Sequence, residues 1–105
     1  MSQEELNEIA REIYSNGKIK IVVMTGKLLG SQRTMEQRIA DAGYVFKESP
    51  TTAGTAFVIH GHSGGLSKIE KAEKYDRPIL TEEDAIKVLD LLMSYRMERL
   101  RTCLL

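Results

Sequence analysis

The stretch that decides the fold runs from Ile19 to Arg33 and reads Ile-Lys-Ile-Val-Val-Met-Thr-Gly-Lys-Leu-Leu-Gly-Ser-Gln-Arg. Its first six residues are mostly apolar and β-branched, which predicts a strand covered on both faces. Gly26 follows that strand, and its missing side chain lets the backbone approach a ligand closely. Ser31 is placed to cap a following helix. Because a strand end followed by a helix N-terminus favours anions, the stretch predicts a binding site as well as a fold.

Length and composition predict one domain with a modest core. The chain has 105 residues, of which 42% are apolar, and this content argues against disorder. No apolar run approaches the ~20 residues that a membrane-spanning helix needs, so we expect no membrane contact. The N-terminus lacks the features of a signal peptide, and the one cysteine, Cys103, excludes an internal disulfide. Both features favour a cytoplasmic location, or a nuclear one in a eukaryote.

Charge is unevenly distributed along a chain whose net charge is zero. Residues 16–80 carry ten Lys and Arg against six Asp and Glu, whereas both ends of the chain are acidic. A mildly basic middle is compatible with a phosphate-bearing ligand. Ordinary solvation of the surface would account for the same charges.

Helices and strands alternate on either side of the deciding stretch. A capping box at Ser2 and Glu5 opens a helix with an apolar stripe that ends before Gly17. Downstream we expect a helix ending at Gly43, short strands at 44–46, 56–59 and 79–80, a helix over 67–75 and a last helix capped by Thr81. Strands this apolar, alternating with helices, imply an α/β fold with a mostly parallel sheet and helices on both faces.

Four segments in chain order resemble BRCT domains, most closely those of NAD-dependent DNA ligases and of the large subunit of replication factor C. They are Val-Val-Met-Thr-Gly-Lys-Leu (22–28, with Arg33 at the usual offset), Gly-Thr-Ala-Phe-Val-Ile-His-Gly (54–61), Gly-Leu-Ser-Lys-Ile-Glu-Lys-Ala (65–72) and Arg-Pro-Ile-Leu-Thr-Glu-Glu-Asp-Ala (77–85). The resemblance covers residues 18–93. It implies a four-stranded parallel sheet of order 2-1-3-4 flanked by three helices. Residues 1–17 would add an N-terminal helix, and residues 94–105 would extend the last helix.

The resemblance also implies a phosphate-binding pocket. Thr25 would donate its hydroxyl group and Gly26 its backbone N–H, while Arg33 supplies a planar donor fork and Lys68 a point charge. Lys68 would occupy the first position of its helix, where a cation is unfavourable unless an anion binds there. In the alternative interpretation Lys68 extends into water. Accessory contacts are expected from His62, Lys27 and Lys71.

The sequence gives little support to metal binding, catalysis or nucleotide binding. His60 and His62 are too few for a closed metal site without further ligands. No Ser or Thr has an identifiable base and orienting group, and Gly26 to Gly30 lacks the ending of a nucleotide-binding loop. We therefore expect no catalytic residue, metal or cofactor, and no enzymatic activity.

The last helix carries an apolar stripe longer than one domain of this size can bury. Its end contributes the candidate interface residues Met93, Met97, Leu100 and Leu104. An exposed apolar stripe usually marks an interface, so self-association or a partner helix is a reasonable hypothesis. The alternatives are contact with the N-terminal helix or a frayed tail.

Together these features predict a non-catalytic binding module that recognises the 5′ phosphate of a DNA end in replication or repair, as an accessory to a DNA ligase or in another setting. An alternative is a phosphopeptide-binding or protein-interaction module that uses the same pocket. A further alternative is a homodimer formed through the last helix.

Overall fold

The computed structural model describes residues 2–48, 54–62, 70 and 72–103. Lys68, Lys71 and Leu104, which the sequence places in candidate sites, lie outside the described residues. The elements, in chain order, are α1 (Gln3–Ser15), β1 (Ile21–Thr25), α2 (Gln32–Asp41), β2 (Val45–Lys47), β3 (Thr55–His60), β4 (Ile79–Thr81) and α4 (Glu82–Cys103). Residues 70 and 72–74 are also helical.

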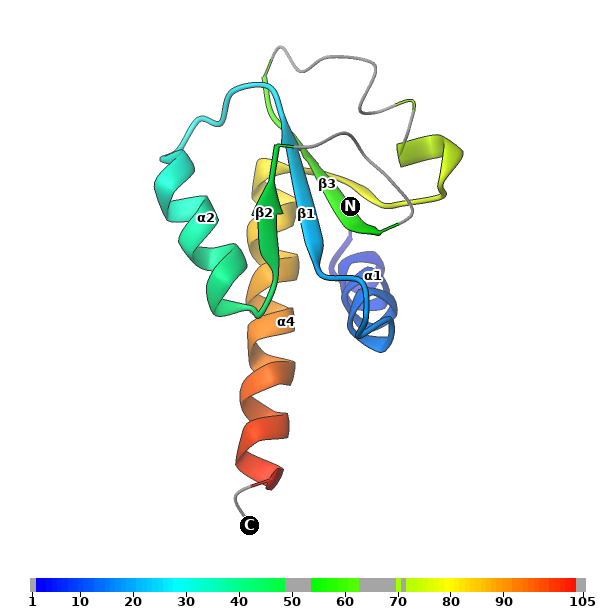
Figure 1. Cartoon of the computed structure of the whole chain (residues 1–105), viewed down its shortest axis with the longest axis vertical. Coiled ribbons are helices and arrows are strands. Elements are labelled where there is room, and N and C mark those ends of the chain that lie inside the picture. The colour runs from blue at the N-terminus through cyan, green and yellow to red at the C-terminus, as the bar shows by residue number, and fades with distance from the viewer. Residues whose placement is uncertain (1, 49–53, 63–69, 71, 104–105) are drawn as a thin grey trace.

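The strands form one four-stranded sheet in the order β2-β1-β3-β4, and every neighbouring pair is parallel. The predicted α/β fold class and the predicted strand order 2-1-3-4 are confirmed. Figure 1 shows β1 and β3 at the centre of the sheet, with α2 and α4 against it. Because the central strands are buried on both faces, β1 and β3 read as nearly continuous apolar runs in the sequence.

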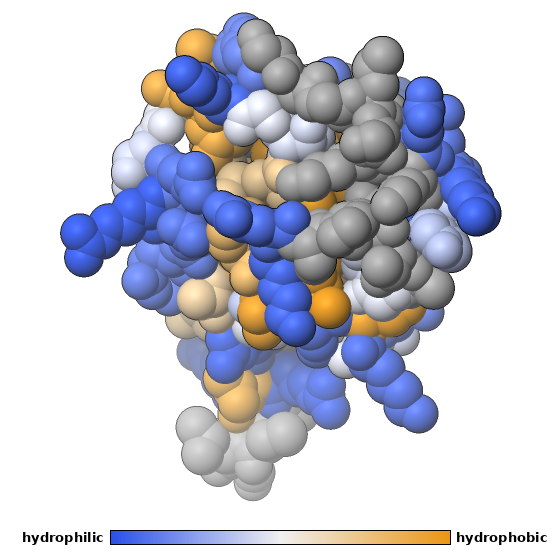
Figure 2. Space-filling view, turned by 45° about the horizontal axis from the view of Figure 1, so that its top comes forward, coloured by the Kyte–Doolittle hydropathy of each residue, from blue (hydrophilic) through white to orange (hydrophobic). Residues whose placement is uncertain are grey.

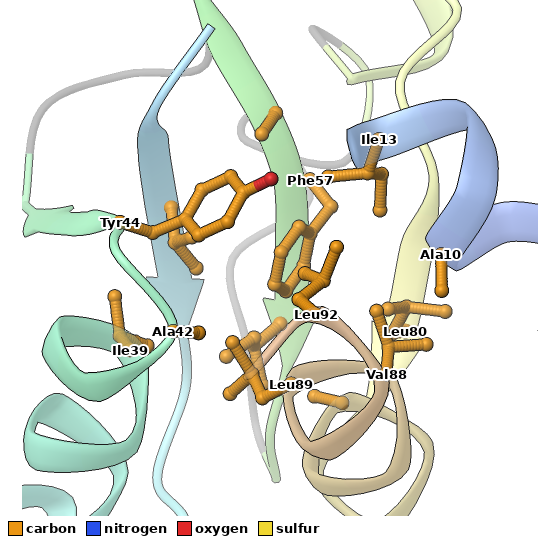
Figure 3. Packing of buried hydrophobic residues seen from close by; sticks show 14 of the residues in the cluster. Ala10, Ile13, Ile39, Ala42, Tyr44, Phe57, Leu80, Val88, Leu89 and Leu92 are labelled. Carbon is orange, nitrogen blue, oxygen red and sulfur yellow. The ribbon is translucent and has the colours of Figure 1, made fainter. Parts of the chain in front are cut away.

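The two faces of the sheet bury apolar groups of very different extent. One face packs against α1, α2 and α4 and holds most of the core, including Phe57, Ile39 and Leu92 (Figure 3). The other face carries a small cluster formed by Val23, Val58 and Ala72. Successive residues of a strand point to opposite faces, so Val22 and Val23 contribute to different clusters. The apolar stripe predicted for α1 is buried in the larger cluster through Leu6, Ala10 and Ile13.

The end of α2 explains why β2 begins one residue later than the sequence indicated. The N–H of Gly43 donates to the carbonyl of Ala40 at 2.9 Å, and the N–H of Tyr44 donates to that of Ile39 at 3.0 Å. This double hydrogen bond is a Schellman motif, and Gly43 supports it with a φ of +88°. Tyr44 therefore completes the helix end, and β2 starts at Val45.

Arg96 of α4 also binds the end of α2. Its guanidinium donates to the backbone carbonyl of Asp41 at 2.9 Å, and a cation at that position interacts favourably with the helix dipole. A Cβ at Gly43 would lie 3.3 Å from Arg96 Cδ, so a larger residue would crowd this contact. The carboxylate of Asp90 lies 3.3 Å from Arg38, which joins α4 to α2 a second time.

Beyond these contacts α4 continues away from the sheet (Figure 1). Leu92 is fully buried, whereas Met93, Met97 and Leu100 are 37%, 60% and 55% exposed. The predicted exposure of the stripe is thus confirmed as far as the described side chains extend. Contact with α1 covers a different side of α4, where the rings of Tyr14 and Tyr95 meet edge to face with centroids 5.4 Å apart. No helix within the described residues combines the length and apolarity needed to cross a membrane.

Tyr44 brings a polar atom into the larger cluster. Its ring centroid lies 6.5 Å from that of Phe57 (Figure 3). Lys20 Nζ lies 4.7 Å from the centroid of the Tyr44 ring. Among the described residues its hydroxyl has no hydrogen-bond partner. Burial, with a smaller contribution from Tyr14, raises the pKa of Tyr44 to about 12.

We predict that Tyr44→Phe leaves the free energy of unfolding at pH 7 unchanged or raises it by up to about 1 kcal/mol, because the buried hydroxyl loses water without gaining a partner. Since the folded-state pKa of Tyr44 lies above the unfolded value of 10.0, wild type should lose stability as the pH rises from 10 towards 12. The Tyr44→Phe variant should not show this part of the loss of stability at alkaline pH. Urea unfolding across this range measures both effects. A loss above about 1 kcal/mol at pH 7 would show that the hydroxyl is satisfied.

Candidate functional site

The carboxyl ends of three parallel strands meet at one edge of the sheet. Thr25 of β1 is in register with His60 of β3, and His60 is in register with Thr81 of β4. Gly26, Gly61 and Glu82 follow these three residues along the chain. The loop after β1 and the first turns of α2 and α4 therefore lie at the same edge, where open α/β sheets usually bind ligands.

The loops after β1 and β3 are joined immediately beyond the strands. The N–H of Gly61 donates to the carbonyl of Thr25 at 2.7 Å. Lys27 and His62 then exchange two backbone hydrogen bonds of 2.8 Å each, as an isolated antiparallel bridge. A Cβ at Gly61 would lie 2.6 Å from the carbonyl oxygen of Lys27, which no real side chain tolerates. The absence of a side chain at Gly61 is therefore required for the two loops to meet.

The far end of the β1–α2 loop is attached to α4. The backbone N–H of Gly30 donates to the carboxylate of Glu82, with both oxygens at 3.2 Å. The following residue, Ser31, caps α2 as predicted, because its hydroxyl accepts from the N–H of Thr34 at 3.3 Å. The loop is consequently held at Lys27 and at Gly30, and α2 begins at a fixed place beside the end of β1.

The first turn of α2 offers a positive surface for an anion. The N–H groups in the first turn of a helix have no intrahelical acceptor, and the helix dipole adds partial positive charge there. Arg33 lies in this turn with an exposed side chain. Gly26, at the end of β1, is exposed and has a φ of +80°. This left-handed conformation favours glycine and presents backbone rather than a side chain to the solvent.

Of the four residues predicted to bind phosphate, three lie at this edge. Thr25 is only 4% exposed, so little of its surface is accessible to a ligand. Gly26 and Arg33 are exposed to solvent. The predicted accessory residues His62 and Lys27 are also exposed here and are joined by the backbone bridge. Lys68 and Lys71 are outside the described residues, so the structure does not place them.

Acidic side chains balance the cations on the α4 side of the edge. A hollow of about 440 Å³ is lined by Lys27, Leu29, His60, Gly61, His62, Thr81, Glu82, Glu83 and Ile86. The carboxylate of Glu82 accepts the hydrogen bond from the N–H of Gly30, and that of Glu83 lies 3.8 Å from the ammonium of Lys87. Gly26 and Arg33, which are both exposed, do not line this hollow. In Figure 2 the described residues at this end of the molecule form apolar patches between hydrophilic side chains.

Among the described residues, the fold brings no metal-binding partners to the two histidines. Within the part of the chain that the structure describes, no group of three His, Cys, Asp or Glu side chains could hold a metal ion. His60 instead ends β3, and His62 forms the bridge to Lys27.

Three features of this edge were not predicted from the sequence. Glu82 and Gly30 are separated by 52 positions, so nothing local indicates their hydrogen bond. The sequence does not indicate that Gly61 approaches Lys27 so closely that a side chain is excluded. No sequence feature separates Leu29 from Leu28, yet Leu29 is 82% exposed while Leu28 packs against the core.

Comparison with known proteins finds similarity to short segments of DNA ligases. The chain is 37% identical to the DNA ligase of Heliobacterium modesticaldum over 71 residues, which is 68% of the chain and 10% of the ligase. It is 35% identical to the DNA ligases of Lactobacillus johnsonii and Lactobacillus gasseri over 92 residues, which is 86% of the chain and 14% of each ligase. No protein-family model matches the chain.

The chain thus spans about a tenth to a seventh of the length of these curated relatives. What it shares with them is a segment, and the four-stranded parallel sheet is consistent with a BRCT-like fold for that segment.

We predict that Gly61→Ala lowers the free energy of unfolding by about 1–3 kcal/mol, because the new Cβ forces the backbone of Lys27 away. Gly17→Ala is the matched control: a Cβ there meets nothing within 4 Å, and the expected change is within about 0.5 kcal/mol. Chemical denaturation measures both values. Equal stability of the Gly61 variant and wild type would contradict the bridge between the two loops.

Proposed function

We propose that the chain is a non-catalytic module that binds the 5′ phosphate of a DNA end at the carboxyl edge of its sheet. The observation that carries the proposal is that exposed Gly26, at the end of a central strand, and the first turn of α2 with its exposed Arg33 lie at the same edge of the sheet. Backbone N–H groups and an arginine fork suit a terminal phosphate, which presents several acceptor oxygens and a high charge density.

The similarity to DNA ligase segments favours nucleic acid over other phosphate-bearing ligands. The resemblance to BRCT domains adds Thr25 and Lys68 to the binding groups. Since the anion would meet a small number of cations, we expect modest affinity that falls with salt. The acidic α1 and the carboxylate of Glu83 disfavour broad contact with the duplex backbone, so recognition would concentrate on the end.

The test is a fluorescence-anisotropy titration with a short blunt duplex, with and without a 5′ phosphate, at two salt concentrations. We expect tighter binding of the phosphorylated duplex. Arg33→Ala and Lys68→Ala should each weaken it about tenfold, because each removes a charge-assisted contact. Each should also reduce the salt slope by about one. Arg99→Ala removes an exposed arginine from α4 and is the matched control, with binding unchanged.

If both pocket variants bind like wild type, the assignment of the pocket is wrong. If wild type does not distinguish the two duplexes, the proposed function is wrong. The salt slope separates these results from a general weakening caused by misfolding, and circular dichroism checks that each variant is folded.

A second candidate, a protein-interaction module, is favoured by the exposed stripe of Met93, Met97 and Leu100. This stripe lies on the part of α4 that points away from the carboxyl edge of the sheet (Figure 1). A second copy of the chain or another protein would therefore bind at the end of the molecule opposite the proposed phosphate site. Sedimentation of wild type over a range of concentrations distinguishes the homodimer from a monomer.

A further inference from the structure

Leu29 has the highest exposure of the large apolar side chains in the described part of the molecule, at 82%. The loop that carries it is attached on both sides, by the bridge between Lys27 and His62 and by the bond from Gly30 to Glu82. The neighbouring Leu28 is the one that packs against the core. The backbone around Leu29 therefore holds its side chain in solvent. A ligand that covers this apolar surface is stabilised by its removal from water.

Leu29 lies close to the proposed anion site. It follows Gly26 by three positions, so their Cα atoms are at most about 11 Å apart. It lines the hollow to which Lys27, His62, Glu82 and Glu83 also contribute. Both carboxylates already have partners there, Glu82 in the N–H of Gly30 and Glu83 in the ammonium of Lys87. The ligand that fits this arrangement has a negative group next to an uncovered apolar face.

This inference rests on the proposed function and makes it more specific. We propose that Leu29 packs against the outer face of the terminal base pair while Gly26 and Arg33 hold the 5′ phosphate of that pair. At a blunt end one face of the last base pair is already uncovered. Contact with it therefore needs no unstacking, in contrast to apolar side chains that enter between base steps within a duplex. Leu29 would thus favour duplex ends over phosphates inside a duplex and over unpaired strands.

The test compares two 5′-phosphorylated probes by anisotropy: a short blunt duplex and one of its strands alone. Leu29→Ser should weaken binding of the duplex about five- to tenfold, as expected for one apolar contact, and change binding of the single strand by less than about twofold. The salt slope should stay unchanged because no charge is removed. Leu29→Met retains the apolar surface and should bind the duplex like wild type.

Val45→Thr is the matched control, since Val45 is 50% exposed and lies at the start of β2, away from the carboxyl edge. It should leave binding unchanged. If Leu29→Ser binds the duplex like wild type while Arg33→Ala does not, the inference is overturned and the proposed function stands. An equal loss on both probes also overturns it. If wild type ignores the 5′ phosphate, or prefers a phosphopeptide, the proposed function and the inference that rests on it are both overturned.

Discussion

The close approach of the chain at Gly61 is the contact on which the carboxyl edge depends. Here the N–H of Gly61 bonds to the end of β1 and the next residues form a bridge of two hydrogen bonds, which only a residue without a side chain permits. The bridge fixes one end of the β1–α2 loop, and the carboxylate of Glu82 fixes the other. The start of α2, Arg33 and Leu29 take their positions from these two attachments.

Contacts with the core and with α2 hold α4 in place as far as Arg96. Its first half supplies Val88, Leu89 and Leu92 to the larger cluster, and its middle is joined to α2 by Asp90 and Arg96. These contacts stabilise about as much helix as the sheet can cover. Beyond them, Met97 and Leu100 continue the apolar periodicity with exposed side chains. The fold therefore has two open surfaces at opposite ends, one charged and built from loops and one apolar and helical (Figure 1).

Much of the architecture could be predicted from the sequence because the signals are local. Buried parallel strands appear as short apolar runs, caps such as Ser31 and Thr81 mark helix starts, and Gly43 marks a helix end. What could not be predicted depends on contacts between distant positions. The capping of α2 by Arg96 spans 55 positions, and the fixing of Gly30 by Glu82 spans 52. Leu28 and Leu29 are identical by composition, and only the geometry of the loop decides which one is buried.

The central claim is that the ligand-binding surface is the carboxyl edge of the sheet and that a terminal phosphate is what it recognises. The most direct test is a map of backbone amide chemical shifts on adding a blunt duplex with or without a 5′ phosphate. The account predicts that the phosphorylated duplex shifts the amides of Gly26, Gln32 and Arg33 most, and that the unphosphorylated duplex shifts them much less. Equal shifts with both duplexes, or the largest shifts at Met97 and Leu100 on α4, would contradict it.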